Sequence, residues 1–259
     1  MQDHSSSAPH FSFLQSEGMG ECFVLLHGIS SGAASWSKQL AADGAHHCLL
    51  AWDAPGYGGS SLLDTPTPNA KDYAQRLKQL ITQRNIKRFT LVGHSLGALM
   101  ASAYAAMYPE DVSRLVLASV AQGYGLADEQ KKQQVYQLRP QMLARLGPKG
   151  LAKERGPALL GRPTAENLAL VKQVMARLTQ SGFEGASYLL AYDSIEHYLG
   201  GVSCPVQMLA GTLDTITPLD DMRLLQQRYP HIELSAIEQA GHLLYVDQPE
   251  RFSSLVFKA

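Results

Sequence analysis

Short apolar runs alternate with longer helical patterns along most of the chain. Seven runs rich in valine, leucine, isoleucine and phenylalanine predict strands, and they cover 11–15, 22–27, 48–53, 89–93, 114–119, 206–210 and 232–237. Strands that are apolar on both faces are typical of parallel sheets covered by helices. Helical patterns lie between these runs, and the alternation predicts an α/β fold. We expect an open, mostly parallel sheet of seven or eight strands with helices on both faces.

Two features interrupt this rhythm. The turn signal Glu17-Gly18-Met19-Gly20 joins the first two strand runs and predicts a hairpin at the edge of the sheet. Between about 122 and 203 no strand pattern occurs, and four helical patterns follow each other instead, over 128–146, 149–160, 165–180 and 184–198. This segment predicts a helical lid, 122–203, inserted into a core made of 1–121 and 204–259. A further helical layer on the sheet is the alternative.

A serine with a glycine two residues away on each side lies at the end of one predicted strand. Gly93-His94-Ser95-Leu96-Gly97 fits the pattern G-x-S-x-G between a strand and a helix. In that context the serine occupies a sharp, strained turn that lifts its hydroxyl above the sheet edge. The glycines remove side chains that would collide in the turn. We therefore expect Ser95 to be a nucleophile.

A serine nucleophile needs a base, and His242 is the best candidate. It follows the last strand run in Gln239-Ala240-Gly241-His242, where a loop returns to the same edge. We expect the side chain of His94 to diverge from the adjacent hydroxyl, and His27 to brace the loop after its strand. The other histidines have surface, packing or tail interpretations, and they are His4, His10, His46, His47, His197 and His231.

A carboxylate must orient that base, and Asp214 is the candidate. It ends the strand run 206–210 in Gly211-Thr212-Leu213-Asp214. Four other aspartates suit other roles: Asp220 and Asp221 a helix start, Asp53 the fixing of a loop, and Asp193 a solvated position. Donors for a developing oxyanion are expected from the backbone N–H groups of Leu96, after the nucleophile, and of Ile29, after an early strand.

These motifs resemble the α/β-hydrolase superfamily over nearly the whole chain. The matching residues are His27-Gly28, Asp53–Ser60, Gly93–Gly97, Gly211–Asp214 and Gly241-His242, and the order Ser95, Asp214, His242 is the order of its triad. The resemblance implies the α/β-hydrolase fold and a hydrolase without a cofactor. The nearest likeness is to small bacterial esterases, enol-lactonases and meta-cleavage-product hydrolases of aromatic catabolism.

The resemblance leaves the substrate open. Ser95 argues against the branches that use an aspartate nucleophile, namely dehalogenases and epoxide hydrolases. Leu243 stands where meta-cleavage-product hydrolases usually carry tryptophan, and Leu96 where they tend to have methionine. The leading hypothesis is a serine hydrolase of a small carboxylic ester or lactone. Carbon–carbon bond hydrolysis and a slowly turning-over ligand receptor are the alternatives.

The lid is expected to set the specificity of the site. Tyr124 and Leu243 are the candidate substrate contacts. Five lid arginines are candidates for binding a substrate carboxylate, although solvated helix positions suit most of them, and they are Arg139, Arg145, Arg155, Arg162 and Arg177. Carbon–carbon cleavage of an acidic substrate would require at least one of them to face Ser95.

Composition and charge narrow the class of partner. A formal net charge of −1 over 259 residues gives no indication of nucleic acid or of an anionic membrane surface. Residues 1–11 lack the basic and apolar regions of a signal peptide, and no apolar run is long enough to span a membrane. Three scattered cysteines predict free thiols in a reducing compartment, hence a cytoplasmic protein. No Cys/His cluster with metal spacing occurs.

Overall fold

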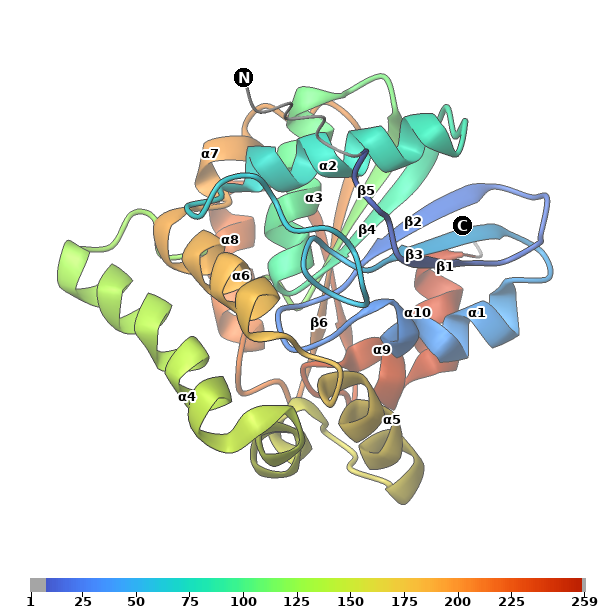
Figure 1. Cartoon of the computed structure of the whole chain (residues 1–259). Helices are drawn as coiled ribbons and strands as arrows, with labels where there is room; N and C mark the ends of the chain where they lie inside the picture. The colour runs from blue at the N-terminus through green and yellow to red at the C-terminus, as the bar shows by residue number, and fades with distance from the viewer. Residues whose placement is uncertain (1–7, 258–259) are drawn as a thin grey trace.

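A seven-stranded sheet forms the centre of the computed structural model, which describes residues 8–257 (Figure 1). The described residues exclude His4 and most of residues 1–11, the segment that lacks the features of a signal peptide. All seven predicted runs are strands: β1 (Phe13–Gln15), β2 (Cys22–Leu26), β3 (Cys48–Trp52), β4 (Phe89–His94), β5 (Val112–Ala118), β6 (Val206–Gly211) and β7 (Glu233–Ile237). Their order is β1-β3-β2-β4-β5-β6-β7, and every pair except β1–β3 is parallel.

The predicted hairpin between the first two strands is wrong. β1 does lie at the edge of the sheet, but it pairs with β3, and β2 lies between β3 and β4. The N–H groups of Gly18 and Gly20 donate to the carbonyls of Gly44 and His46, at 3.0 and 3.1 Å. The turn is thereby held against the segment that leads into β3. This contact comes from a distant part of the chain, so the local turn signal does not reveal the pairing.

Helices cover both faces of the sheet, as predicted. Figure 1 shows α2 and α3 together on one face and α1, α9 and α10 together on the other. The bounds are η1, a 3₁₀ helix (Ala33–Trp36), α1 (Ser37–Asp43), α2 (Ala70–Gln83), α3 (Leu96–Met107), α8 (Leu219–Arg228), α9 (Leu244–Asp247) and α10 (Pro249–Val256). α3 is buried almost all round because it packs between the sheet and α2. No helix within residues 8–257 is long and apolar enough to cross a membrane.

The segment between β5 and β6 is helical. It contains α4 (Glu129–Arg155), the 3₁₀ helix η2 (Pro157–Leu159), α5 (Ala165–Met175), α6 (Gln180–Tyr192) and α7 (Glu196–Leu199), which we call the inserted helices. α4 is broken at Gly147, whose φ of 65° is left-handed, and Pro148 follows. The sequence predicted a boundary there between two helical patterns, because glycine and proline interrupt a helix.

Asp193, expected to be solvated, is buried. It follows α6 and is only 4% exposed. Its carboxylate accepts hydrogen bonds from the N–H of Ala70, at the start of α2, and from the hydroxyl of Tyr198, at 2.8 and 2.7 Å. His197 Nδ1 lies 2.9 Å from the other carboxylate oxygen. Asp193 therefore fastens the inserted helices to the first turn of α2, where a negative charge also suits the helix dipole.

We expect Asp193→Asn to lower the free energy of unfolding by about 3 kcal/mol, because it removes a buried charge that several donors need. Urea unfolding followed by circular dichroism measures the loss. Asp220→Asn is the matched control, since Asp220 is exposed and, in the described part of the chain, forms its ion pair only with Arg223 on its own helix. That control should change the free energy by less than about 0.5 kcal/mol. Equal losses in the two variants would contradict the anchoring role of Asp193.

Candidate active site

The turn from β4 into α3 carries Ser95 in a strained conformation. Its φ of 54° and ψ of −118° are unusual for a residue with a side chain. The flanking glycines make room for this turn. A Cβ on Gly93 would lie 2.4 Å from the carbonyl oxygen of Gly97, and one on Gly97 would lie 2.5 Å from that of Leu26. The end of β2 can therefore approach the start of α3 closely.

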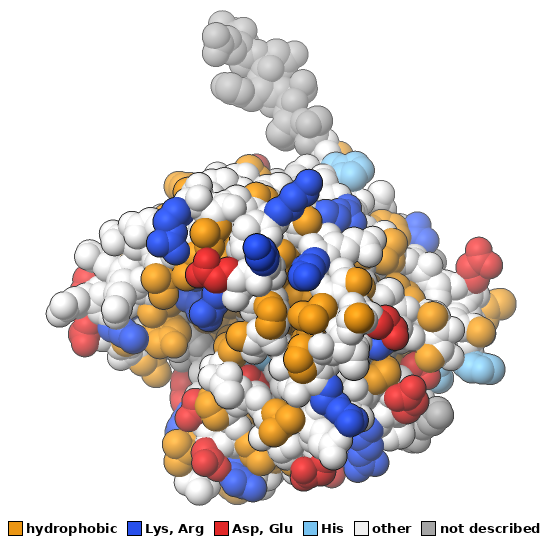
Figure 2. Space-filling model, turned by 90° about the horizontal axis from the view of Figure 1, so that it is seen from below, with side chains coloured by type: hydrophobic (Ala, Val, Ile, Leu, Met, Phe, Trp, Pro, Cys, Tyr) orange, Lys and Arg blue, Asp and Glu red, His pale blue; other side chains and the backbone are white. Residues whose placement is uncertain are grey.

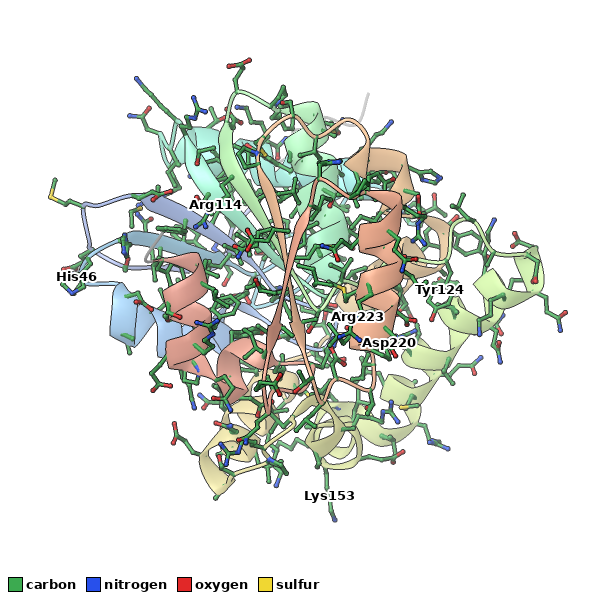
Figure 3. All side chains as sticks on the ribbon, turned by 180° about the vertical axis from the view of Figure 1, so that it is seen from behind. His46, Arg114, Tyr124, Lys153, Asp220 and Arg223 are labelled. Atoms are coloured by element: carbon green, nitrogen blue, oxygen red, sulfur yellow. The ribbon has the colours of Figure 1, made fainter. Side chains whose placement is uncertain are left out.

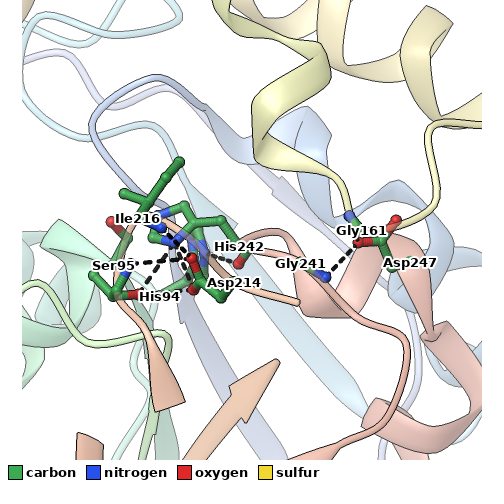
Figure 4. A network of polar contacts seen from close by, with 9 residues as sticks. His94, Ser95, Gly161, Asp214, Ile216, Gly241, His242 and Asp247 are labelled. Atoms are coloured by element: carbon green, nitrogen blue, oxygen red, sulfur yellow. Dashed lines mark hydrogen bonds and ion pairs between the residues drawn. The ribbon is translucent and has the colours of Figure 1, made fainter. Parts of the chain in front are cut away.

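Three predicted site residues from separate strand ends meet at this turn. Ser95 Oγ lies 2.9 Å from His242 Nε2, and His242 Nδ1 lies 2.9 Å from Asp214 Oδ2 (Figure 4). Ser95 follows β4, Asp214 follows β6, and His242 follows β7. Each is only 5% exposed. With a proton on Nδ1, His242 donates to Asp214, and its free Nε2 accepts the hydroxyl hydrogen of Ser95.

The carboxylate of Asp214 is held by four donors. Besides His242 it accepts from the N–H groups of Ile216 and Thr217, at 2.8 and 3.0 Å, and from the Thr217 hydroxyl at 2.8 Å. Burial raises the pKa of Asp214, but the hydrogen bond and charge of His242, together with these backbone donors, hold it well below its usual range. The group is therefore ionised at neutral pH. The sequence analysis did not identify Thr217. A threonine three residues after an aspartate nevertheless suits a turn in which it donates back to that carboxylate.

His94 supports the loop of His242 and does not bond the Ser95 hydroxyl. Its Nε2 lies 2.8 Å from the carbonyl oxygen of His242, whereas its Nδ1 is buried and has no hydrogen-bond partner among residues 8–257. Burial, followed by the nearby charge of His242, lowers the pKa of His94 to about 3. The neutral ring therefore donates from Nε2 and fixes the backbone that carries His242.

This buried neutral histidine predicts an acid-sensitive stability. Below about pH 6.5 the unfolded chain protonates His94 and the folded chain does not, down to about pH 3. The free energy of unfolding should therefore decrease as the pH is lowered from about 6.5, by up to about 1.4 kcal/mol per pH unit for this one group. His94→Gln keeps an N–H donor but does not titrate. Urea unfolding between pH 7.5 and 5 should show a shallower loss in this variant, and parallel losses would contradict the prediction.

Asp247 holds the same loop from the other side. One carboxylate oxygen accepts from the N–H of Gly241 and from the N–H of Gly161, both at 2.8 Å (Figure 4). The N–H of Leu243 donates to the carbonyl of Leu159 at 2.9 Å. The residues on both sides of His242 are thus tied to the segment between η2 and α5. The sequence reasoning missed Asp247, because its contact with Gly161 joins distant parts of the chain.

The residues of the two expected oxyanion donors lie at the same cavity as Ser95. Ile29 and Leu96 both line the cavity above Ser95. Within residues 8–257, neither backbone N–H has a hydrogen-bond partner. The carbonyl of Ile29 accepts from the Tyr57 hydroxyl at 2.8 Å, which helps to fix the backbone next to this N–H. A Cβ on Gly28 would lie 2.9 Å from the Cβ of Ser95, so only glycine permits this approach.

A cavity of about 420 Å³ opens above Ser95 and His242. Tyr124 and Leu243, the expected substrate contacts, both line it, and Figure 3 shows Tyr124 on the segment that leads from β5 to α4. The inserted helices contribute mostly apolar lining, from Leu138, Met142, Leu151, Leu159, Met175, Phe183 and Leu190. Two of the five candidate arginines, Arg139 and Arg155, line it as well. Such a volume and lining suit a small, largely apolar ligand.

The remaining candidates lie outside the hydrogen-bonded group. The N–H of Ala54 donates to His27 Nε2 at 3.0 Å, and the N–H of Ala33 donates to Asp53 at 2.8 Å, so both side chains brace loops. His46 is exposed on the opposite side of the molecule from Tyr124 (Figure 3).

Residues 8–257 contain no group of three or more histidine, cysteine or acidic side chains that could hold a metal.

Comparisons with known proteins agree with this architecture. The model of the alpha/beta hydrolase family matches residues 23–255. A pimeloyl-[acyl-carrier protein] methyl ester esterase of Photobacterium profundum is 30% identical, over 92% of this chain and 94% of its own. Among solved structures, a thermophilic esterase from Thermogutta terrifontis has a TM-score of 0.85 at 23% identity, over 96% of this chain and 92% of its own. The enol-lactonase from Burkholderia xenovorans has a TM-score of 0.76 at 20% identity, over 96% and 95%.

Proposed function

Because this chain belongs to the alpha/beta hydrolase family, we propose that it is a serine hydrolase that cleaves a small carboxylic ester or lactone through an acyl-enzyme on Ser95. The observation that carries this proposal is the continuous chain of hydrogen bonds from Ser95 through His242 to Asp214, next to a largely apolar cavity. The similarity to an esterase, at 30% identity over most of both chains, supports the same reaction class.

The first half of the reaction forms the acyl-enzyme. Ser95 Oγ attacks the substrate carbonyl while His242 Nε2 takes the hydroxyl proton. The N–H groups of Ile29 and Leu96 donate to the oxygen that becomes negative. His242 then returns its proton to the leaving oxygen, and the alcohol, or the opened alcohol end of a lactone, departs from the carbonyl carbon. Asp214 holds the ring in the required tautomer and stabilises its charged form.

The second half releases the acid. His242 removes a proton from a water molecule, whose oxygen attacks the acyl carbon, and then protonates Ser95 Oγ as it leaves. The segment 122–203 acts as a lid on the core formed by 1–121 and 204–259, and its apolar side chains select the substrate. Tyr124, from the lid, and Leu243, next to the base, contact that substrate.

Loss of the nucleophile should abolish turnover without unfolding the protein. We expect Ser95→Ala to lower kcat for nitrophenyl esters, from acetate to octanoate, by at least about 10⁴-fold. Asp214→Asn should lower it by about 10³- to 10⁴-fold, because the ring loses the acceptor that fixes its tautomer. Release of nitrophenolate measures both effects, and circular dichroism checks the fold.

Ser102→Ala is the matched control, since among residues 8–257 its hydroxyl bonds only to the carbonyl of Ala98 within α3. Its kcat should stay within about twofold of wild type. Full activity in Ser95→Ala would overturn the acyl-enzyme. Absence of ester turnover in a folded wild type would favour carbon–carbon cleavage or a receptor role.

The support of the histidine loop by Asp247 should also be visible in catalysis. Asp247→Ala leaves the N–H groups of Gly241 and Gly161 without their acceptor. A base displaced by a fraction of an ångström loses efficiency, so we expect kcat to fall by about tenfold or more with KM little changed. Steady-state kinetics on a nitrophenyl ester measures this, and unaltered kcat would contradict the role.

Carbon–carbon bond hydrolysis is the second candidate, and one observation favours it. A substrate of that class carries a carboxylate, and Arg139 and Arg155 line the cavity that contains Ser95. Leu96 and Leu243, where that class usually has methionine and tryptophan, weigh against it. Ester hydrolysis therefore remains the preferred function.

A further inference from the structure

Two arginines bring unpaired positive charge into the largely apolar cavity. Arg139 is half-buried and Arg155 is exposed, and both belong to α4. In the described part of the chain, neither side chain takes part in an ion pair or a hydrogen bond with another residue. Asp221, at the start of α8, is the one acidic residue that lines this cavity within residues 8–257, and it is exposed. The cavity thus holds more cationic than anionic side chains.

The break in α4 explains how both arginines reach one cavity. On a straight helix, Arg139 and Arg155, sixteen positions apart in the sequence, would lie about 24 Å apart along the axis. Gly147, with its left-handed φ of 65°, stands between them and redirects the chain. Both halves of α4 therefore line the same space.

The surroundings of Arg139 indicate a site for an anion. Burial lowers the pKa of its guanidinium, Tyr124 raises it, and the like charge of Arg155 lowers it again. A partly desolvated guanidinium normally pairs with a carboxylate or phosphate, to which it can donate two parallel hydrogen bonds. No such group from residues 8–257 pairs with Arg139.

The other lid arginines differ from these two. Arg145, Arg162 and Arg177 do not line the cavity. Figure 2 views the molecule from the side on which α4 and α5 lie, and basic side chains are scattered among hydrophobic ones there. Arg139 and Arg155 are therefore set apart by their position at the candidate active site, not by their residue type.

We propose that the substrate carries a carboxylate in addition to its scissile bond, and that Arg139, assisted by Arg155, binds this carboxylate. The inference rests on the proposed function, because it names the substrate class of the same site. The preferred substrate is then a half-ester of a dicarboxylic acid, or a lactone with an acid group. The apolar lining contacts the chain between the two ends.

Matched ester pairs test the charge requirement. On the acyl side, the 4-nitrophenyl half-ester of adipic acid is compared with 4-nitrophenyl hexanoate, which has the same chain length without the carboxylate. On the alcohol side, 4-carboxyphenyl hexanoate is compared with its methyl ester at the carboxyl group. We expect wild type to prefer the charged member of one pair by at least about tenfold in kcat/KM, and the pair that shows this identifies the end of the substrate that carries the acid.

Arginine variants connect the preference to the proposed residues. Arg139→Gln should remove at least about tenfold of kcat/KM for the charged ester, mainly through KM, and should not lower kcat/KM for the neutral ester, because a neutral ligand no longer covers an unpaired guanidinium. Arg155→Gln should have a smaller effect, because that side chain is exposed to solvent. Arg145→Gln is the matched control, since it removes the same charge from the same helix outside the cavity, and both esters should be unaffected.

The outcomes separate this inference from the proposed function. Ser95-dependent hydrolysis of the neutral esters with no preference for charge, or equal losses for both esters in Arg139→Gln, overturns the carboxylate site alone. If wild type hydrolyses none of the esters, the ester function fails. Adipate is then titrated into Ser95→Ala and into the same protein with Arg139→Gln, with the melting temperature as readout. Stabilisation that depends on Arg139 supports the site, and its absence overturns it.

Discussion

The left-handed backbone at Ser95 is the constraint on which the rest of the site depends. A residue with a side chain in such a conformation costs about 1–3 kcal/mol, which the surrounding packing must offset. Ser95 and Leu96, at the two sides of the turn, both line one cavity. The end of β2 also passes within contact distance of the start of α3, which the glycine at 97 allows. The position of Ile29, just after β2, follows from this close approach.

His242 lies on a loop, and its precision comes from neighbours and not from a helix or strand. His94 holds its carbonyl, Asp247 holds the preceding N–H, and the carbonyl of Leu159 holds the following one. Gly161 and Gly241 approach so closely that a Cβ on Gly241 would lie 2.3 Å from the nitrogen of Gly161. The segment between η2 and α5 is therefore in direct contact with the loop that carries His242, so a movement of the inserted helices would move this loop as well.

The sequence predicted those features that are encoded within a few residues. The strands coincide with the predicted runs, although β7, with Glu233 and Ser235, is less apolar than the central strands. Ser95, Asp214 and His242 each follow one of these runs, and a parallel sheet brings such strand ends to one edge. The missed features depend on contacts between distant segments. Asp193 looks like any polar residue near the end of a helix, and only the packing against α2 buries it. Asp247 likewise acquires its role from a loop more than eighty residues away.

The two charged groups Asp214 and Arg139 differ in how their charges are compensated. The carboxylate of Asp214 is buried and its charge is stabilised by four hydrogen-bond donors, so it is not an exposed negative charge in the cavity. Arg139 is half-buried in the lining with no carboxylate paired to it in residues 8–257. A neutral ligand that covered this guanidinium would add to its desolvation without giving it a partner, whereas an anion would compensate the loss of water. Discrimination in such a cavity therefore arises as much from the penalty on neutral ligands as from attraction to charged ones.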